Sequence, residues 1–253
     1  MRRFFKRIGM YNLDINNLTL HFKDKNVFET ADIFDFYHYA HHQTKPTTVN
    51  WRIHSLVQKG VLQRVGRGKY SLGKSKNYVP EILPKQKTLY KKIRKSFPFA
   101  DICVWHTSIF NEFMLHQAGK FYHLVEAEKD ATEAIFYFLK ENKLAAFLNP
   151  NQEILDRYIS EIQNVFIVKS LVSEAPVQKT DNVITVTLEK ALVDVFCDET
   201  LFATQQGAEM RTIFNEALSK YTVNQSKMLR YANRRKRKAE FEDYLNIISN
   251  YRQ

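Results

Sequence analysis

Three carboxylates near the ends of two apolar segments have a spacing that suits a metal-dependent nuclease. Asp101 begins one apolar segment, and Glu126 and Glu128 end the next one along the chain. Residues two apart on a strand share a face, and carboxylates gathered there can hold Mg²⁺. The lysine usual in such sites is missing from that face, because Lys129 directly follows Glu128 and would point to the opposite face of the strand. Simple solvation also explains acidic strand ends, so a nuclease or other defence enzyme acting on nucleic acid is the alternative function.

Other catalytic patterns are missing from the sequence. Nucleotidyl transfer needs paired carboxylates beside a Gly-Ser turn, so that two metal ions clamp a triphosphate, and the chain contains no Gly-Ser pair. None of the eight histidines has metal-site spacing with cysteines or carboxylates, and seven glycines leave no Gly-rich phosphate loop. His41 and His42 fall in a predicted turn, where phosphate contact and solvent exposure are both reasonable. We therefore expect no enzyme activity, no cofactor and no metal site.

A basic hairpin is the strongest binding signal in the chain. Residues 57–73, "VQKGVLQRVGRGKYSLG", contain the helix-ending Gly60 and then two short apolar strands around a Gly-containing turn. Arg64, Arg67 and Lys69 project near the tip, with no acid to neutralise them. Basic hairpins also occur on solvated surfaces, so the upstream segments decide between these interpretations.

Two short helices are predicted upstream, one after Thr30 and one after Pro46, across a tight turn. In the second helix, Val49, Ile53 and Leu56 share one face. The other side chains of this helix point outward and could contact base edges in a major groove. The predicted DNA contacts are Thr47, Thr48, Asn50, Trp51, His54, Ser55 and Gln58. The alternative is that Trp51 packs against a neighbouring domain.

Helix, turn, helix and basic hairpin together predict a winged helix-turn-helix over residues 12–73. The hairpin is then the wing, and Arg64, Arg67 and Lys69 lie along phosphates or reach into a minor groove. The expected partner is double-stranded DNA.

The distribution of charge supports a polyanionic partner. The net charge is +11, and it divides into +14 for residues 1–100, −8 for 101–200 and +5 for 201–253. An acidic middle between basic ends indicates a polyanion held by both ends.

Cysteine usage and hydropathy predict a cytoplasmic protein without membrane contact. Cys103 and Cys197 each lie in an apolar segment, as buried free thiols of a reducing compartment do. The basic first residues are not followed by an apolar stretch of signal-peptide length, and no run approaches 18 apolar residues.

The remaining chain is predicted to form an α/β domain and a helical region. Residues 74–88 contain two prolines and several lysines, and we interpret them as a linker. Over 89–187, apolar strands alternate with helices of about ten residues, which indicates an α/β sheet domain. Residues 188–253 are predicted to be helical after an N-cap at Thr187. The fold class is therefore α+β or α/β multidomain: an N-terminal winged helix-turn-helix, a middle α/β sheet domain and a helical C-terminal region.

A second basic segment, "SKMLRYANRRKRK" at 226–238, contains no acid. Spacings of three and four place several of its cations on one helical face, which could follow a phosphate backbone. Its predicted DNA contacts are Lys227, Arg230, Arg234, Arg235 and Arg237. A solvated face, RNA and an acidic partner surface are the alternatives.

Three segments resemble the AbiEi-like antitoxins of bacterial type IV toxin-antitoxin systems. "VNWRIHSLVQKGVLQRVGRGKYSLG" resembles their winged-helix end, and "VTLEKALVDVF" and "SKMLRYANRRKRK" resemble their C-terminal half. The resemblance implies a repressor of its own operon, whose C-terminal part counteracts a nucleotidyltransferase-like toxin encoded beside it, without needing a stable complex with that toxin. The aromatic-rich middle segment does not align with the better-known members. The sequence is also compatible with a homodimer.

Overall fold

A computed structural model describes residues 13–40, 44–73, 77–117 and 119–250. The chain forms two compact units: unit 1 comprises residues 1–77 and 219–226, and unit 2 comprises residues 78–218 and 227–253. Helices and small sheets occur in both, so the prediction of a mixed α and β protein is confirmed at this level. Within the described ranges, every helix is too short or too polar to span a bilayer.

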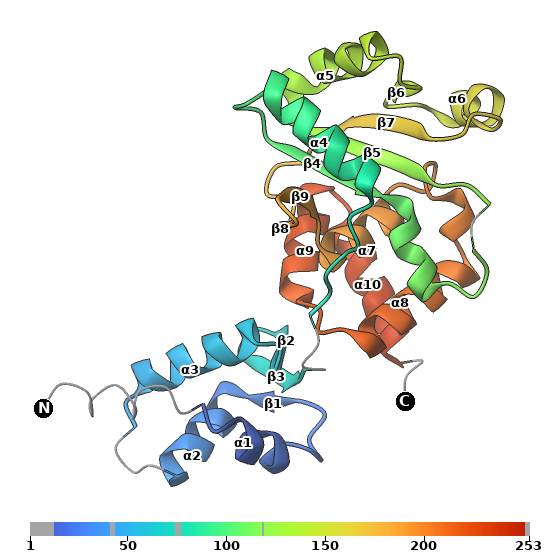
Figure 1. Ribbon diagram of the computed structural model, residues 1–253. Helices are drawn as coiled ribbons and strands as arrows, with labels where there is room; N and C mark the ends of the chain where they lie inside the picture. The colour runs from blue at the N-terminus through green and yellow to red at the C-terminus, as the bar shows by residue number, and fades with distance from the viewer. Residues whose placement is uncertain (1–12, 41–43, 74–76, 118, 251–253) are drawn as a thin grey trace, which may run out of the picture. The chain divides into compact units, whose positions relative to one another are not determined.

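Unit 1 combines helices with a small antiparallel sheet. Its described elements follow in the order α1 (Ile15–His21), β1 (Phe28–Glu29), α2 (Thr30–Ala40), α3 (Pro46–Gln58), β2 (Leu62–Gly66) and β3 (Lys69–Leu72) (Figure 1). The strands pair in the order β1-β3-β2, so that β3 lies in the middle and β2 and β3 form a hairpin.

Helix α3 has local causes for both of its ends. Pro46 lies in the first turn, where an N–H would have no partner inside the helix. Gly60 follows the helix with a φ of 69°, the left-handed conformation that ends many helices. Val49, Ile53 and Leu56 are buried in the core of unit 1, which confirms the predicted inward face.

The turn of the hairpin is attached to the start of α2. Gly68 has a φ of 70°, a conformation that glycine adopts without steric cost. Its carbonyl accepts hydrogen bonds from the backbone N–H of Thr30 at 2.9 Å and from the Thr30 hydroxyl at 3.2 Å. Strand β1 pairs with β3 through Phe28 and Tyr70. These bonds hold the turn in place and leave its side chains exposed.

Unit 2 is organised around a mixed sheet with the strand order β4-β5-β7-β6. Its strands are β4 (Ile102–His106), β5 (Tyr122–Ala127), β6 (Ala146–Leu148) and β7 (Val165–Ser170). Strand β4 is antiparallel to β5, whereas β5 and β6 both run parallel to β7. A separate hairpin consists of β8 (Val177–Thr180) and β9 (Val183–Val186).

Helices cover both faces of this sheet (Figure 1). On one face, α4 (Pro84–Ser96) and α5 (Lys129–Glu141) pack their apolar side chains against the core strands. The other face carries Trp105 and Glu126, which contact α7 (Leu188–Cys197) through Lys190. The later helices are α8 (Ala208–Lys220), α9 (Gln225–Arg234) and α10 (Lys238–Asn250).

The predicted alternation of strands and helices is largely confirmed, with three local differences. Helix α4 begins at Pro84, inside the segment 74–88 predicted as a linker, because Pro84 and the capping side chain of Gln86 form a good helix start. Residues 107–113 form a 3₁₀ helix, in which the buried Phe110 and Phe113 share a face at a spacing of three.

The third difference is the predicted helix after residue 151. It is short and irregular, and consists of α6 (Gln152–Ile154) followed by a π-helical turn (Leu155–Ile159). At the start of α7, the hydroxyl of Thr187 accepts from the Lys190 N–H, which confirms the predicted N-cap. Apart from 219–226, residues 89–253 pack into unit 2, although the sequence separates 89–187 from 188–253.

Candidate nucleic-acid interface

The outward face of α3 carries polar and aromatic side chains. The exposed residues are Thr47, Asn50, Trp51, His54 and Gln58, and the partly exposed ones are Thr48 and Ser55. Spacings of three and four place the exposed residues on one stripe, opposite the buried Val49, Ile53 and Leu56. Hydrogen-bond donors, acceptors and a flat apolar surface therefore lie together on this helix, as recognition of base edges requires.

Arg52 is the one charged residue of α3, and it points inward. Its guanidinium lies 4.5 Å from the centre of the Tyr37 ring, so it stacks between α2 and α3. Two of its nitrogens, Nε and Nη1, are buried without a hydrogen-bond partner among the described residues. The sequence pattern did not predict this inward arginine, and the exposed face of α3 consequently lacks Lys and Arg.

The hairpin carries the cations that α3 lacks. Arg64, Arg67 and Lys69 are all exposed, and the Arg64 guanidinium lies 5.8 Å from the centre of the Tyr70 ring. Residues 36–80 contain eight Lys and Arg and no Asp or Glu. The acids of residues 13–80 all precede residue 36. The α3 and hairpin segments therefore form a continuous acid-free region; His41 and His42, predicted in its turn, lie outside the described residues.

The basic segment 226–238 does not form the single helical face that its spacing predicts. Helix α9 ends at Arg234, and Lys236 adopts a φ of 58°, so Arg237 leaves the helix. Most of the cations pair with acids of unit 2: Lys227 with Glu189, Arg234 with Glu174, Arg235 with Asp194, and Arg237 with Glu199. Arg230 remains exposed. Because these acids come from distant segments, the sequence alone could not reveal them. The cations do not share one continuous helical face, and their contact with DNA stays a prediction.

A buried network of ionic and hydrogen-bonded side chains explains the two C-terminal motifs. The Lys190 ammonium is fully buried and lies 2.5 Å from both a Glu126 and an Asp194 carboxylate oxygen. The other Asp194 oxygen accepts from the Tyr231 hydroxyl at 2.9 Å and from Arg235 at 2.7 Å. "LEKALVD" and "LRYANRR" thus meet at one carboxylate. Spacings of four within each motif, Lys190 to Asp194 and Tyr231 to Arg235, are the sequence signal for this pairing.

The electrostatics keep the Lys190 ammonium charged and the Tyr231 hydroxyl protonated. Burial by itself would lower the pKa of the Lys190 ammonium, but Asp194 and Glu126 raise it well above its usual range. Burial and the Asp194 charge both raise the pKa of Tyr231, so its hydroxyl stays protonated as a donor. Trp105 contributes an indole N–H to Glu126 at 3.3 Å. Every charge in the network therefore has an opposite charge or a hydrogen bond.

A family of unknown function (DUF6577) matches residues 48–251. The chain belongs to this family. No curated protein matches its sequence. The region matched in DUF6577 includes nearly all of α3, the whole hairpin and the buried network of unit 2.

One of the three carboxylates of the nuclease hypothesis, Glu126, lies apart from the other two in this DUF6577 chain. Glu126 faces α7 and forms an ion pair with Lys190, whereas Asp101 and Glu128 are exposed beyond the strand ends. Asp101 and Glu128 do line one cavity, together with Lys129. In the described ranges, no three His, Cys, Asp or Glu side chains gather as metal ligands. The alternation that predicted Glu126 and Glu128 on one face fails because β5 ends at Ala127.

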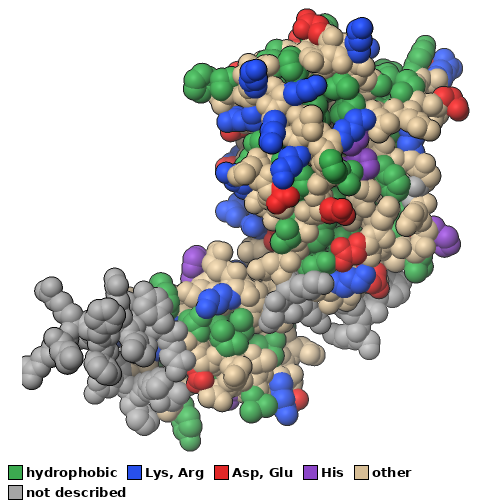
Figure 2. All heavy atoms as spheres, viewed as in Figure 1, with side chains coloured by type: hydrophobic (Ala, Val, Ile, Leu, Met, Phe, Trp, Pro, Cys, Tyr) green, Lys and Arg blue, Asp and Glu red, His purple; other side chains and the backbone are tan. Residues whose placement is uncertain are grey.

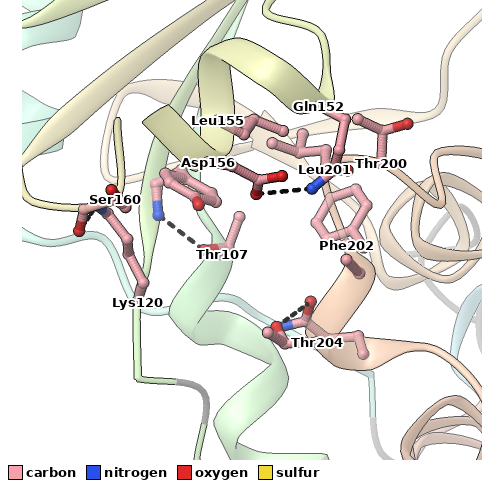
Figure 3. A pocket seen from close by; sticks show the side chains of 13 residues that line it. Thr107, Lys120, Gln152, Leu155, Asp156, Ser160, Thr200, Leu201, Phe202 and Thr204 are labelled. Carbon is pink, nitrogen blue, oxygen red and sulfur yellow. Dashed lines mark hydrogen bonds between the residues drawn. The ribbon is translucent and has the colours of Figure 1, made fainter. Parts of the chain in front are cut away.

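A second cavity of unit 2, of about 230 Å³, has a polar lining (Figure 3). The Lys120 ammonium donates to the carbonyls of Ile159 and Ser160, and the Gln152 amide donates to Asp156 at 2.8 Å. The Thr107 hydroxyl accepts from the backbone N–H of Tyr122 at 2.9 Å. These groups hold the walls of the cavity together, and the exposed side chains of α3 and the hairpin are the better candidate interface.

Removing Asp194 should strongly destabilise unit 2. Asp194→Ala leaves Lys190, Tyr231 and Arg235 without a shared acceptor, and breaking such a buried pair costs about 3–5 kcal/mol. Urea unfolding followed by circular dichroism measures this loss, and Asp194→Asn tests whether the charge or the shape matters.

Glu199→Ala is the matched control, because it also removes one carboxylate but breaks an exposed pair with Arg237. Exposed pairs contribute about 0–1 kcal/mol. Equal losses of stability in Asp194→Ala and Glu199→Ala would show that the network does not stabilise unit 2.

Proposed function

We propose that this chain is a DNA-binding transcriptional regulator whose unit 1 is a winged helix-turn-helix. The observation that carries the proposal is the combination of polar and aromatic groups on the exposed face of α3 with three exposed cations on the hairpin, in a segment, residues 36–80, that contains no acid. The order helix, strand, helix, helix, strand, strand, with the sheet order β1-β3-β2, supports the winged-helix interpretation. In that arrangement α3 is the recognition helix and the β2–β3 hairpin is the wing.

The two parts of this surface have different tasks. Phosphate contacts position a protein on the duplex, and base contacts select the sequence. Arg64, Arg67 and Lys69 suit the first task, because guanidinium and ammonium groups pair with phosphate oxygens. The stripe on α3 suits the second task, because its side chains lie on a rigid helix and are mostly uncharged.

The absence of exposed Lys and Arg from described α3 residues predicts which bases it reads. Arg and Lys are the commonest partners of guanine, whereas Asn and Gln pair with adenine and apolar groups contact the thymine methyl. The exposed stripe offers the amides of Asn50 and Gln58 and the ring of Trp51. The single arginine of the helix, Arg52, is buried against Tyr37. We therefore expect α3 to read A·T base pairs.

The same proposal assigns an antitoxin role to unit 2. The resemblance to AbiEi-like antitoxins supports it, since "LEKALVD" and "LRYANRR" lie at the buried network of that unit. The regulator would then repress its own operon and counteract a nucleotidyltransferase-like toxin encoded beside it. Co-expression with that neighbouring gene tests this part: growth should be restored by the wild type and by Arg64→Ala with Arg67→Ala. Growth arrest that persists with the wild type removes the antitoxin role and leaves DNA binding intact.

The wing should account for part of the salt dependence of DNA binding. Arg64→Ala combined with Arg67→Ala should reduce the slope of log affinity against log salt by about 1.8, since each lost phosphate contact removes about 0.9. Fluorescence anisotropy with a labelled duplex of random sequence, over a series of salt concentrations, measures the slope.

Two controls make this result specific. Lys140→Ala with Lys143→Ala removes the same charge from exposed positions of unit 2, and Arg52→Met removes the buried arginine of α3. Both should retain the wild-type slope. If the hairpin variant also retains the wild-type slope, the hairpin does not contact phosphate. A separate assay tests the nuclease alternative: cleavage of plasmid DNA in Mg²⁺ that is abolished by Asp101→Ala would favour it.

The outward face of α3 should determine sequence preference. Selection from a random duplex pool should enrich sites with an A·T core, and Gln58→Ala or His54→Ala should cost about 1–3 kcal/mol at such a site. Affinity for random DNA should stay nearly unchanged, because these side chains are not phosphate contacts in the proposal. Competition binding against the selected site measures both quantities.

Trp51→Ala separates recognition from packing. A recognition role predicts relaxed sequence preference with an unchanged melting temperature, whereas packing against another domain predicts a lower melting temperature with intact preference. Enrichment of a G·C core would overturn the expected base preference while leaving DNA binding in place.

A further inference from the structure

Helix α4 of unit 2 is strongly and uniformly basic. Its 13 residues include Lys85, Lys87, Lys91, Lys92, Arg94 and Lys95, and no acid occurs between residues 82 and 100. Together with the α3 and hairpin segments, residues 36–100 hold 14 Lys and Arg against the single acid Glu81. The basic, acid-poor segment of the chain therefore extends from unit 1 into α4 of unit 2.

The apolar face of α4 directs these cations outward. Leu89, Tyr90 and Ile93 are buried against the sheet, so Lys91, Lys92 and Lys95 lie on the exposed side. Figure 2 shows Lys and Arg side chains gathered over this part of unit 2. The cations thus form a surface patch, defined here as the α4 patch: Lys91, Lys92 and Lys95.

The α4 patch lacks the partners that usually accompany a solvated basic helix. Lys87 pairs with Asp181 at 3.6 Å, and Arg94 donates to the Ala100 carbonyl at 2.7 Å. In the part of the chain that the structure describes, no carboxylate lies within ion-pair distance of Lys91, Lys92 or Lys95. These three cations are therefore available to an external anion.

The position of the charges also opposes helix stability. Like charges four residues apart on a helix repel each other, as Lys87 and Lys91 do, and also Lys91 and Lys95. Lys95 lies in the last turn, where the helix dipole favours a cation, so the dipole does not oppose the patch. The repulsion between Lys91 and Lys95 remains, and a bound polyanion would relieve it, which is the physical reason to assign the patch a ligand.

We propose that the α4 patch is a second DNA-contact surface, which binds phosphates of a DNA duplex. This inference rests on the proposed function, because a basic patch attracts any polyanion and the stripe on α3 is the part that selects DNA.

This assignment replaces the C-terminal contact expected from the sequence. The segment 226–238 uses most of its cations inside unit 2, whereas the α4 patch does not. The sequence signal for α4 was its acid-free run, which the linker interpretation of 74–88 partly concealed.

Salt-dependent binding to a random duplex of about 30 base pairs tests the proposal. Lys91→Ala, Lys92→Ala and Lys95→Ala together should reduce the log-log slope by up to about 2.7, three contacts at about 0.9 each. Alanine is the best helix former, so α4 should persist, and an unchanged melting temperature checks this. The matched control is Lys140→Ala, Lys143→Ala and Lys179→Ala, which removes three exposed cations elsewhere on unit 2 and should keep the wild-type slope.

Hydroxyl-radical footprinting on a selected site provides a second readout. The triple variant should lose protection over part of the site and keep the protection that α3 and the hairpin provide. An unchanged slope and footprint overturn the proposal, as does a loss of affinity for RNA or an acidic protein without a loss for DNA. If the wild type binds no DNA, the proposed function itself fails; if only the hairpin variant is impaired, the function stands and the α4 patch is solvated.

Discussion

The fully buried ammonium of Lys190 is the constraint on which unit 2 depends. An isolated buried charge costs several kcal/mol after relaxation, so Lys190 requires acids on more than one side. Glu126 supplies one from β5, and Asp194 supplies another from the next turn of α7. Asp194 in turn requires donors, which Tyr231 and Arg235 of α9 provide. One buried charge therefore ties the sheet to two helices, one of them about forty residues further along the chain.

This arrangement separates the charges of the chain into two populations. Several acids of unit 2 pair with cations of the same unit: Glu126 and Asp194 in the network, and Glu174 and Glu199 with Arg234 at the end of α9 and Arg237 after it. The cations of residues 36–100 have almost no acids near them in sequence. A formal charge of +11 thus understates the basic surface that the hairpin and α4 offer to a polyanion.

Residues of the candidate interface differ in how far the sequence predicted them. The period of Val49, Ile53 and Leu56 predicted the buried face of α3, and glycines predicted the turn of the hairpin. Arg52 was not predicted to point inward, because the helix period specifies a face but not the Tyr37 ring that receives the guanidinium. The ion pairs of the basic segment 226–238 were not predicted for a similar reason, since a free and a paired arginine look alike in sequence.

The sequence by itself determined the local elements of this protein: where α3 starts and stops, where the hairpin turns, which faces are apolar, and where charge accumulates. These properties depend on neighbouring residues and on the periods of helix and strand. Only the tertiary structure decided which charges are neutralised, because an ion pair requires two groups within about 4 Å whatever their separation in sequence. It left Lys91 exposed on α4, buried Lys190 beneath the sheet and paired Arg235 with Asp194, although all three read as simple basic residues.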